Sequence, residues 1–206
     1  MAHQFFLDRK IQSGLTYQQY LEMFQKKFQE TDISKLNEEQ LKKFETTKLN
    51  FQRTTRINKT YNVNKILSDK LTEINQPQLW MIITEDWCGD SAQTIPYIAK
   101  ITECNQLIDL RLILRDNNPD IMDHYLTNGN RSIPKLVAFD LDGNELFQWG
   151  PRPKEAQDLV NRAKAEGKPK EQFLNELYLW YSRNKGKNLE EEFIALLDDV
   201  LSIAHN

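Results

Sequence analysis

One cysteine stands where its thiol could act as a nucleophile. Cys88 lies in the run Trp87-Cys-Gly-Asp-Ser91, after an apolar segment and before a segment with helical spacing. The first turn of a helix has unpaired N–H groups and a partial positive charge, and both favour the thiolate, the reactive form of cysteine. Gly89 would let the backbone approach the sulfur closely. We therefore interpret Cys88 as a candidate nucleophile, and the competing interpretation is a buried structural cysteine.

Acidic side chains near Cys88 act against an ionised thiol. Glu85, Asp86 and Asp90 are close to it in sequence, and carboxylates disfavour a neighbouring thiolate. A short acidic side chain also suits the start of a helix, so Asp90 could instead cap the helix that follows. The sequence leaves this balance open and predicts no strongly acidic thiol.

The second cysteine is too far along the chain to pair with the first. Cys104 follows sixteen residues after Cys88, near the far end of the same predicted helix. At about 1.5 Å per residue the two are roughly 24 Å apart, whereas a disulfide needs Cα atoms within about 7 Å. We expect Cys104 to pack in the core, and two cysteines in 206 residues form no disulfide framework.

The segments around Cys88 predict an α/β core with a mixed four-stranded sheet flanked by helices. An apolar run before Cys88 is typical of a buried central strand, and a turn signal at 141–144 predicts a hairpin between the last two strands. The order of elements joins a β-α-β unit to this hairpin. The expected strands are 79–84, 109–115, 131–139 and 145–149, and the expected core helices are 62–74, 89–106, 121–126 and 153–166.

Further helices are predicted on both sides of this core. Thr16 with Gln19, and Asn188 with Glu191, have the spacing of capping boxes, and Asn37 is a third cap. Each helix carries an apolar stripe, so we expect it to pack on the core. The predicted boundaries are 1–61 for a helical N-terminal extension, 62–167 for the core and 168–206 for a C-terminal helical extension. The sequence leaves open whether the extensions cover the core or form a homodimer.

Three features in order resemble the thioredoxin superfamily. The Trp-Cys-Gly run around Cys88 is followed eight residues later by Pro96, which resembles the family's kinking proline. Ile133-Pro134, before a strand, resembles the cis-proline loop that faces the active thiol. Gly150, after the last strand, resembles the glycine of the substrate groove. The run Thr-Glu-Asp-Trp-Cys-Gly-Asp at 84–90 resembles a bacterial thioredoxin-like branch, and the likeness covers about half the chain.

The resemblance implies a thioredoxin-like fold and assigns roles to the residues that match. Cys88 and Ser91 would be the catalytic residues, because they occupy the positions of the family's two active-site cysteines. The substrate-binding residues would be Trp87, Gly89, Asp90, Ile133, Pro134 and Gly150.

Two departures from the family pattern change the expected chemistry. Ser91 stands where the second cysteine would be, and Ile82 stands where a buried, proton-accepting aspartate would be. Both losses affect the step in which a second thiolate resolves the mixed disulfide. The resemblance therefore implies a monothiol (CxxS) thiol-disulfide exchange protein that forms mixed disulfides with protein disulfides or a low-molecular-weight thiol. The alternatives are a non-catalytic thioredoxin-fold module that binds an extended peptide or protein partner, and a thiol-transfer enzyme that uses glutathione or a related thiol.

Several other classes of site and location are disfavoured. A net charge of −3, with acidic residues interleaved among the basic residues of 42–65, favours a solvated helix face over a nucleic-acid site. His3, His124 and His205 are scattered, and no phosphate- or dinucleotide-binding glycine motif is present, so we expect no metal and no cofactor. The longest apolar run, at 79–83, is too short to cross a bilayer, and the first residues lack the long apolar stretch of a signal peptide, so we expect no export signal. We expect no membrane association and a cytoplasmic location.

Overall fold

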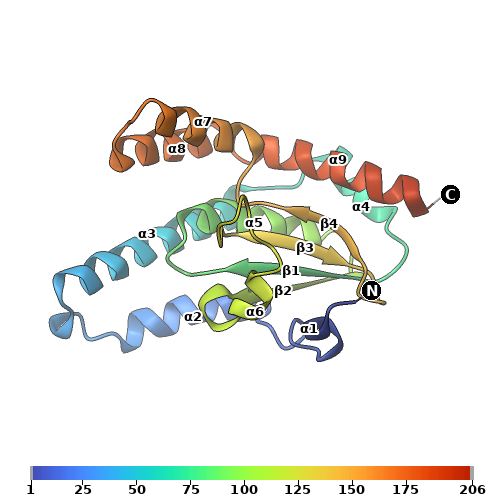
Figure 1. The fold of residues 1–206 in the computed structure, drawn as a ribbon, viewed down its shortest axis with the longest axis horizontal. Coiled ribbons are helices and arrows are strands. Elements are labelled where there is room, and N and C mark those ends of the chain that lie inside the picture. Colours follow the sequence, from blue (N-terminus) through green and yellow to red (C-terminus); the bar gives the residue numbers. More distant parts are fainter. Residues whose placement is uncertain (1, 205–206) are drawn as a thin grey trace.

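The computed structural model describes residues 2–204, with side chains described over 2–202; His205 lies outside them. The chain forms a four-stranded sheet surrounded by helices (Figure 1). The strands are β1 (Gln78–Thr84), β2 (Ile108–Leu114), β3 (Lys135–Phe139) and β4 (Glu145–Trp149), in the spatial order β2-β1-β3-β4. The predicted α/β class with a mixed four-stranded sheet is confirmed.

The strand directions follow from the connections. β1 pairs with β2 in parallel, and such a pair needs a crossover, which helix α5 (Gly89–Thr102) supplies. β3 runs antiparallel to both β1 and β4, and the β3–β4 hairpin closes through Gly143, whose φ is +80°. β1 therefore lies between two neighbours and is buried along its whole length.

The two faces of β1 pack against different sets of helices. Trp80 and Ile82 join a large core with α5, α2 (Tyr17–Glu30), α3 (Glu38–Thr60), α4 (Lys65–Thr72) and α9 (Lys187–Ala204). Met81 and Ile83 join a second core with the short helices α1 (Gln4–Leu7) and α6 (Pro119–Met122). Alternate strand residues point to opposite faces, which accounts for a run that is apolar throughout.

The N-terminal helices begin at their predicted caps. Thr16 and Asn37 each form a capping box with the residue three positions later, at the starts of α2 and α3. An aromatic cluster joins these two helices; its members are Phe24, Phe28, Phe44 and Phe51. Just before α2, Leu15 exchanges two backbone hydrogen bonds of 2.8 Å with Leu112. This contact covers part of the outer edge of β2.

The C-terminal helices pack on one another and on the sheet. α7 (Lys154–Ala165) and α8 (Lys170–Asn184) share a small apolar cluster and lie side by side in Figure 1. Gly186, with φ +87°, turns the chain directly from α8 into α9. The predicted cap at Asn188 is wrong, because α9 already begins at Lys187 and the Asn188 N–H donates to Asn184 Oδ1 at 3.2 Å.

Other element ends also differ from the prediction, and the short helix predicted over 121–126 spans Pro119–Met122. α4 begins at Lys65 rather than near residue 62, because the Asn64 side chain caps it. α5 ends at Thr102, and the Asn105 side chain then donates to the carbonyl oxygens of Leu71, in the last turn of α4, and of Ile74, just after α4. β3 begins at Lys135, because residues 131–134 form a loop. No helix within residues 2–204 is both long enough and apolar enough to cross a membrane.

Candidate functional site

The Cys88 thiol lies at the start of α5, directly after β1. Cys88 is the N-cap residue of α5, and its Sγ is 3.5 Å from the backbone N of Ser91, which donates to it. The thiol in turn donates to the carbonyl oxygen of Ile133, with an Sγ–O distance of 3.3 Å. Only 8% of Cys88 is exposed. The structure thus brings the turn after β1 and the loop before β3 together around one sulfur.

The loop before β3 carries the proline singled out in the sequence. The Ile133–Pro134 bond is cis, and this loop contributes the carbonyl that faces Cys88. Gly150 lies against the same loop with φ +112°, and a Cβ there would be 2.3 Å from the Pro134 carbonyl oxygen. Only glycine fits this backbone conformation and this close approach. Gly150 therefore allows the end of β4 to pack closely against the backbone of this loop.

Ser91 occupies the position of a second thiol and is 1% exposed. Its Oγ accepts a hydrogen bond from Thr84 Oγ1 at 2.8 Å, and its backbone N–H donates to the sulfur. The Ser91 side chain also lowers the pKa of the thiol by hydrogen bonding. Ile82 is fully buried in the large core. Cys104 follows the end of α5 with its Sγ 3.7 Å from the Lys100 carbonyl oxygen, and both cysteines are free thiols.

Asp90 does not cap α5, because Cys88 takes that position. Its carboxylate forms an ion pair with Arg152, which follows Gly150, and accepts from the Tyr181 hydroxyl of α8 at 2.8 Å. Neither Arg152 nor Tyr181 was predicted to belong to the site. Both come from segments more than sixty residues away in sequence, and no local pattern marks them.

The pKa of the Cys88 thiol is raised to about 11, mainly by burial. The nearby Asp90 carboxylate contributes to this increase, while hydrogen bonds from Ser91 and from the Asp90 backbone oppose it. Desolvation and a like charge disfavour the thiolate more than the start of the helix favours it. The thiol is therefore protonated at neutral pH.

Trp87 is half-buried beside the thiol and lies between two cations. The Arg115 guanidinium is 4.9 Å from the ring centroid, and the Lys43 ammonium is 5.9 Å from it. Such cation–π contacts are typical of a partly exposed indole. The basic α3, interpreted from sequence as a solvated face, thus contributes Lys43 to this surface.

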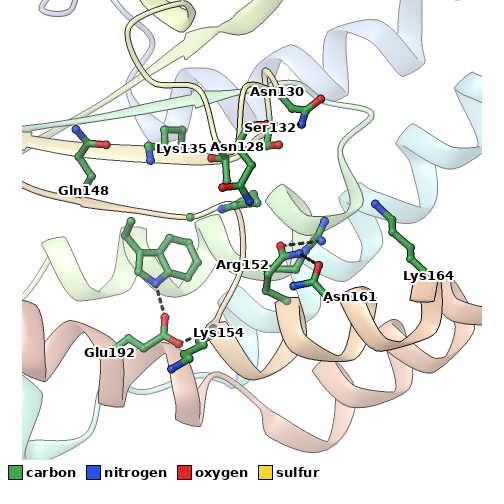
Figure 2. Close-up of a pocket in the computed structure, with 15 residues that line it drawn as sticks. Asn128, Asn130, Ser132, Lys135, Gln148, Arg152, Lys154, Asn161, Lys164 and Glu192 are labelled. Atoms are coloured by element: carbon green, nitrogen blue, oxygen red, sulfur yellow. Dashed lines mark hydrogen bonds between the residues drawn. The ribbon is translucent and has the colours of Figure 1, made fainter. Parts of the chain in front are cut away.

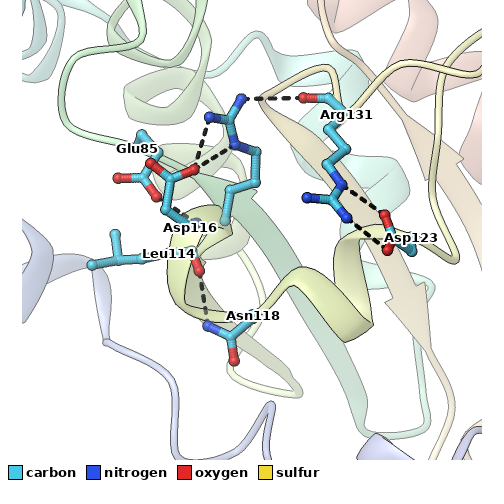
Figure 3. Close-up of polar contacts among 7 residues, drawn as sticks. Glu85, Leu114, Asp116, Asn118, Asp123 and Arg131 are labelled. Carbon is cyan, nitrogen blue, oxygen red and sulfur yellow. Dashed lines mark hydrogen bonds and ion pairs between the residues drawn. The ribbon is translucent and has the colours of Figure 1, made fainter.

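A polar network connects the Cys88 turn to the cis-proline loop (Figure 3). Glu85 Oε1 accepts from the Asp116 N–H at 2.8 Å, and burial raises the pKa of this carboxyl. Arg115 pairs with Asp116 and also donates to the Arg131 carbonyl oxygen at 3.3 Å. Arg131 forms a two-bond ion pair with Asp123. These contacts fix the position of the loop relative to the thiol.

Helices of both extensions also hold the turn that contains Cys88. Lys27 of α2 pairs with Asp86, and Asn50 of α3 donates to the Asp86 carbonyl oxygen at 3.2 Å. On the other side Tyr178 of α8 lies against Gly89, where a Cβ would be 2.3 Å from the tyrosine hydroxyl. The aromatic residues of α8 therefore pack at the site as well as in the core.

The described side chains contain no group of three or more His, Cys, Asp or Glu residues that could hold a metal ion. The groups around Cys88 are instead the Ser91 backbone N–H, which donates to the sulfur, and the ion-paired carboxylate of Asp90. The sulfur therefore lies against the backbone of the loop before β3.

Comparison with known proteins gives a family and a fold. The family model described as Thioredoxin matches residues 35–166, and no curated protein matches the chain. Two similar solved structures are a protein of unknown function from Pseudomonas aeruginosa and an HIV epitope scaffold, with TM-scores of 0.52 and 0.51. Each is 14% identical in sequence to this chain, and each alignment covers 93% of this chain and 98% of the other protein's chain. At this identity the likeness shows the fold alone.

Proposed function

Because the chain belongs to the thioredoxin family, we propose that it performs monothiol thiol-disulfide exchange through Cys88. One observation carries this proposal. The Cys88 Sγ lies at the first turn of α5 and 3.3 Å from the carbonyl oxygen of Ile133. A substrate bound along the loop before β3 would therefore bring its own sulfur to Cys88.

The exchange has two steps. The Cys88 thiolate attacks one sulfur of a substrate disulfide, a mixed disulfide forms, and the other substrate sulfur leaves as a thiolate and takes up a proton. Ser91 offers no sulfur to resolve this mixed disulfide. The thiolate of an external protein or low-molecular-weight thiol then attacks the substrate sulfur, forms a new disulfide with it and releases Cys88 as a thiolate.

The surroundings of Cys88 make its resting thiol a slow nucleophile. With a pKa of about 11, roughly one molecule in ten thousand carries the thiolate at pH 7. The exchange rate should therefore rise with pH over the whole range in which the protein stays folded.

The same burial favours a second candidate function, a non-catalytic module that binds an extended peptide or protein partner at the loop before β3. In this case Trp87, Ile133 and Pro134 would contact the partner, and Cys88 would be a packed residue of the second core. The two functions differ in whether the sulfur reacts in the folded protein.

Reaction of Cys88 with iodoacetamide and with the small disulfide cystamine separates these functions. The experiment uses a Cys104→Ser background, and Cys88→Ala is the unreactive control. For an exchange protein, alkylation accelerates about tenfold per pH unit towards a midpoint near 11, and cystamine gives a mixed disulfide at Cys88 visible by mass. If the folded protein forms neither adduct at any pH, exchange is wrong and the binding module is supported.

A further inference from the structure

A cavity of about 730 Å³ lies beside the site, between the loop before β3, the end of β4 and helix α7 (Figure 2). Its wall is polar and comes from four separate segments. The residues that line it are Thr127, Asn128, Asn130, Ser132, Lys135, Gln148, Trp149, Gly150, Pro151, Arg152, Lys154, Gln157, Asn161, Lys164 and Glu192. Gly150 and Arg152 belong to both the cavity wall and the candidate site, but the proposed exchange at Cys88 requires no ligand in the cavity.

The most informative residue in the wall is a buried lysine. Lys135, the first residue of β3, is only 9% exposed, and it forms no salt bridge with any carboxylate of the described chain. Burial lowers the pKa of its ammonium group. The Glu145 carboxylate raises that pKa without forming a salt bridge with Lys135, and it already accepts hydrogen bonds from Tyr125 and Gln148. Buried charges are normally paired, so the position of Lys135 points to an anion that the described part of the chain does not provide.

Three further cations face the same space. Lys154 and Lys164 of α7 have no salt bridge within the described chain, and Figure 2 shows both side chains on this helix. Arg152 pairs with Asp90, but its Nε is buried without a hydrogen-bond partner. The carboxylate of the wall, Glu192, is already engaged by the Trp149 Nε1 and the Lys154 backbone N, at 2.6 and 2.7 Å.

The balance of charge and donors in this wall is unlike that of the chain as a whole. The chain has a net charge of −3, yet four cations and one carboxylate line the cavity. Neutral groups that can donate hydrogen bonds stand among the cations; they are the side chains of Asn128, Asn130, Ser132, Gln148 and Asn161. Ammonium, guanidinium and amide donors together are the groups that recognise carboxylates and phosphates.

We propose that this cavity binds a small polyanion that carries carboxylate or phosphate groups, with Lys135 as the buried cation that pairs with it. Lys154, Lys164 and Arg152 supply further positive charge from the turn after β4 and from α7. The size of the cavity suits a small molecule. The proposal does not depend on the reactivity of Cys88.

Two probe anions test the proposal on the full-length protein. Citrate represents polycarboxylates and pyrophosphate represents phosphates, and each is titrated by calorimetry and thermal unfolding against sodium chloride of matched ionic strength. A ligand that binds only the folded state raises the melting temperature with its concentration. We expect saturable binding of at least one probe, and the stronger one identifies the class. The proposal is overturned if neither probe binds more tightly, or raises the melting temperature more, than sodium chloride of matched ionic strength does.

Two lysine variants locate the binding. Lys135→Met keeps the aliphatic stem but removes the buried charge, so we expect at least tenfold weaker binding together with a higher melting temperature without ligand. Lys164→Gln should weaken binding about threefold. Lys170→Gln is the matched control, because Lys170 is exposed on α8 and lies outside the wall, and it should bind as the wild type does. Unchanged binding by Lys135→Met overturns the proposal. If that variant does not fold, the double variant Lys154→Gln, Lys164→Gln replaces it, and unchanged binding by the double variant overturns the proposal.

Discussion

At Cys88 the immediate neighbours decide how reactive the sulfur is. The Ser91 N–H favours the thiolate, while burial and the Asp90 carboxylate favour the protonated thiol. Arg152 and Tyr181 hold that carboxylate in place. Asp90 is therefore the residue whose charge can be changed with the clearest effect on the sulfur.

Asp90→Asn should make Cys88 more reactive. The substitution removes the like charge and leaves the Arg152 cation unpaired near the thiol, and both changes lower the thiol pKa. A decrease of one unit in the thiol pKa gives about ten times more thiolate at a fixed pH well below the pKa. We expect iodoacetamide labelling at pH 8 in a Cys104→Ser background to accelerate by about that factor.

Tyr181→Phe is the matched control for this substitution. It removes the hydroxyl that donates to Asp90 but keeps the carboxylate, so labelling should change much less. Equal rates in the Asp90→Asn variant and the wild type would show that the Asp90 charge does not act on the sulfur.

Ser91→Cys should convert the site into a dithiol site. The new thiol would lie one helical turn after Cys88, close enough to bridge. We expect an intramolecular disulfide under mild oxidation, seen as a loss of two hydrogens by mass, and a gain of insulin reduction. The gain should be partial, because Ile82 cannot accept a proton.

The wild type provides the comparison for the dithiol variant. It should reduce insulin poorly by itself and form no internal disulfide, since Cys104 lies beyond the other end of α5. A wild type that matched a dithiol thioredoxin in this assay would refute the monothiol mechanism. A Ser91→Cys variant that stayed reduced would refute the site geometry.

Among the secondary-structure elements, the contact between the end of β4 and the loop before β3 positions the site. Gly150 makes this contact with φ +112° and with the Pro134 carbonyl oxygen 2.3 Å from where a Cβ would lie. A side chain here meets backbone rather than a flexible side chain, so the loop must shift to admit it.

Gly150→Ala should destabilise the protein more than its backbone angle alone explains. Gly167→Ala is the control, because Gly167 has φ +67° but no atom within 4 Å of the place where a Cβ would lie. Alanine in a left-handed conformation costs about 1–2 kcal/mol, and the clash at Gly150 should add roughly 1–3 kcal/mol. Urea unfolding measures both. Equal losses in the two variants would mean that the close approach does not matter.

Across the whole molecule, the terminal helices and the sheet share one core. Phe24 of α2 and Phe193 of α9 both belong to the cluster around Trp80, and the Phe193 ring lies 5.9 Å from that of Trp80. The extensions are therefore expected to unfold together with the sheet rather than before it.

Phe193→Ala should test this cooperativity. The side chain is fully buried, so its truncation should lower the free energy of unfolding by about 3–5 kcal/mol. Leu179→Ala, at a position 49% exposed on α8, should change it by about 0.5 kcal/mol. Far-UV and near-UV circular dichroism should give one shared transition in urea. An early transition that leaves a protease-resistant fragment near residues 60–167 would show instead that the extensions are independent.

Much of the fold could be predicted from local patterns. The uniformly apolar 79–84 run predicts a central strand, because a strand between two neighbours and two helical layers has no polar face. The starts of α2 and α3 could be predicted because a capping box is a contact between residues three apart. The cap predicted at Asn188 is wrong since Asn184, in the preceding helix, makes the contact at the start of α9.

Some features of the candidate site could likewise be predicted from local sequence, and others could not. The position of the thiol could be predicted from the sequence, because the end of a strand and the start of a helix are local features. Its surroundings depend on how distant segments pack: Asp90 contacts Arg152 and Tyr181, and Trp87 lies between Lys43 and Arg115.

Lys135 shows the difference most clearly. As one residue of a predicted strand it carries no signal of its own, and only the packing of β4 and α7 around it makes it a buried charge without a salt-bridge partner in the described chain. Desolvation and electrostatic pairing depend on distances in space between residues far apart in the chain, and no local spacing encodes them.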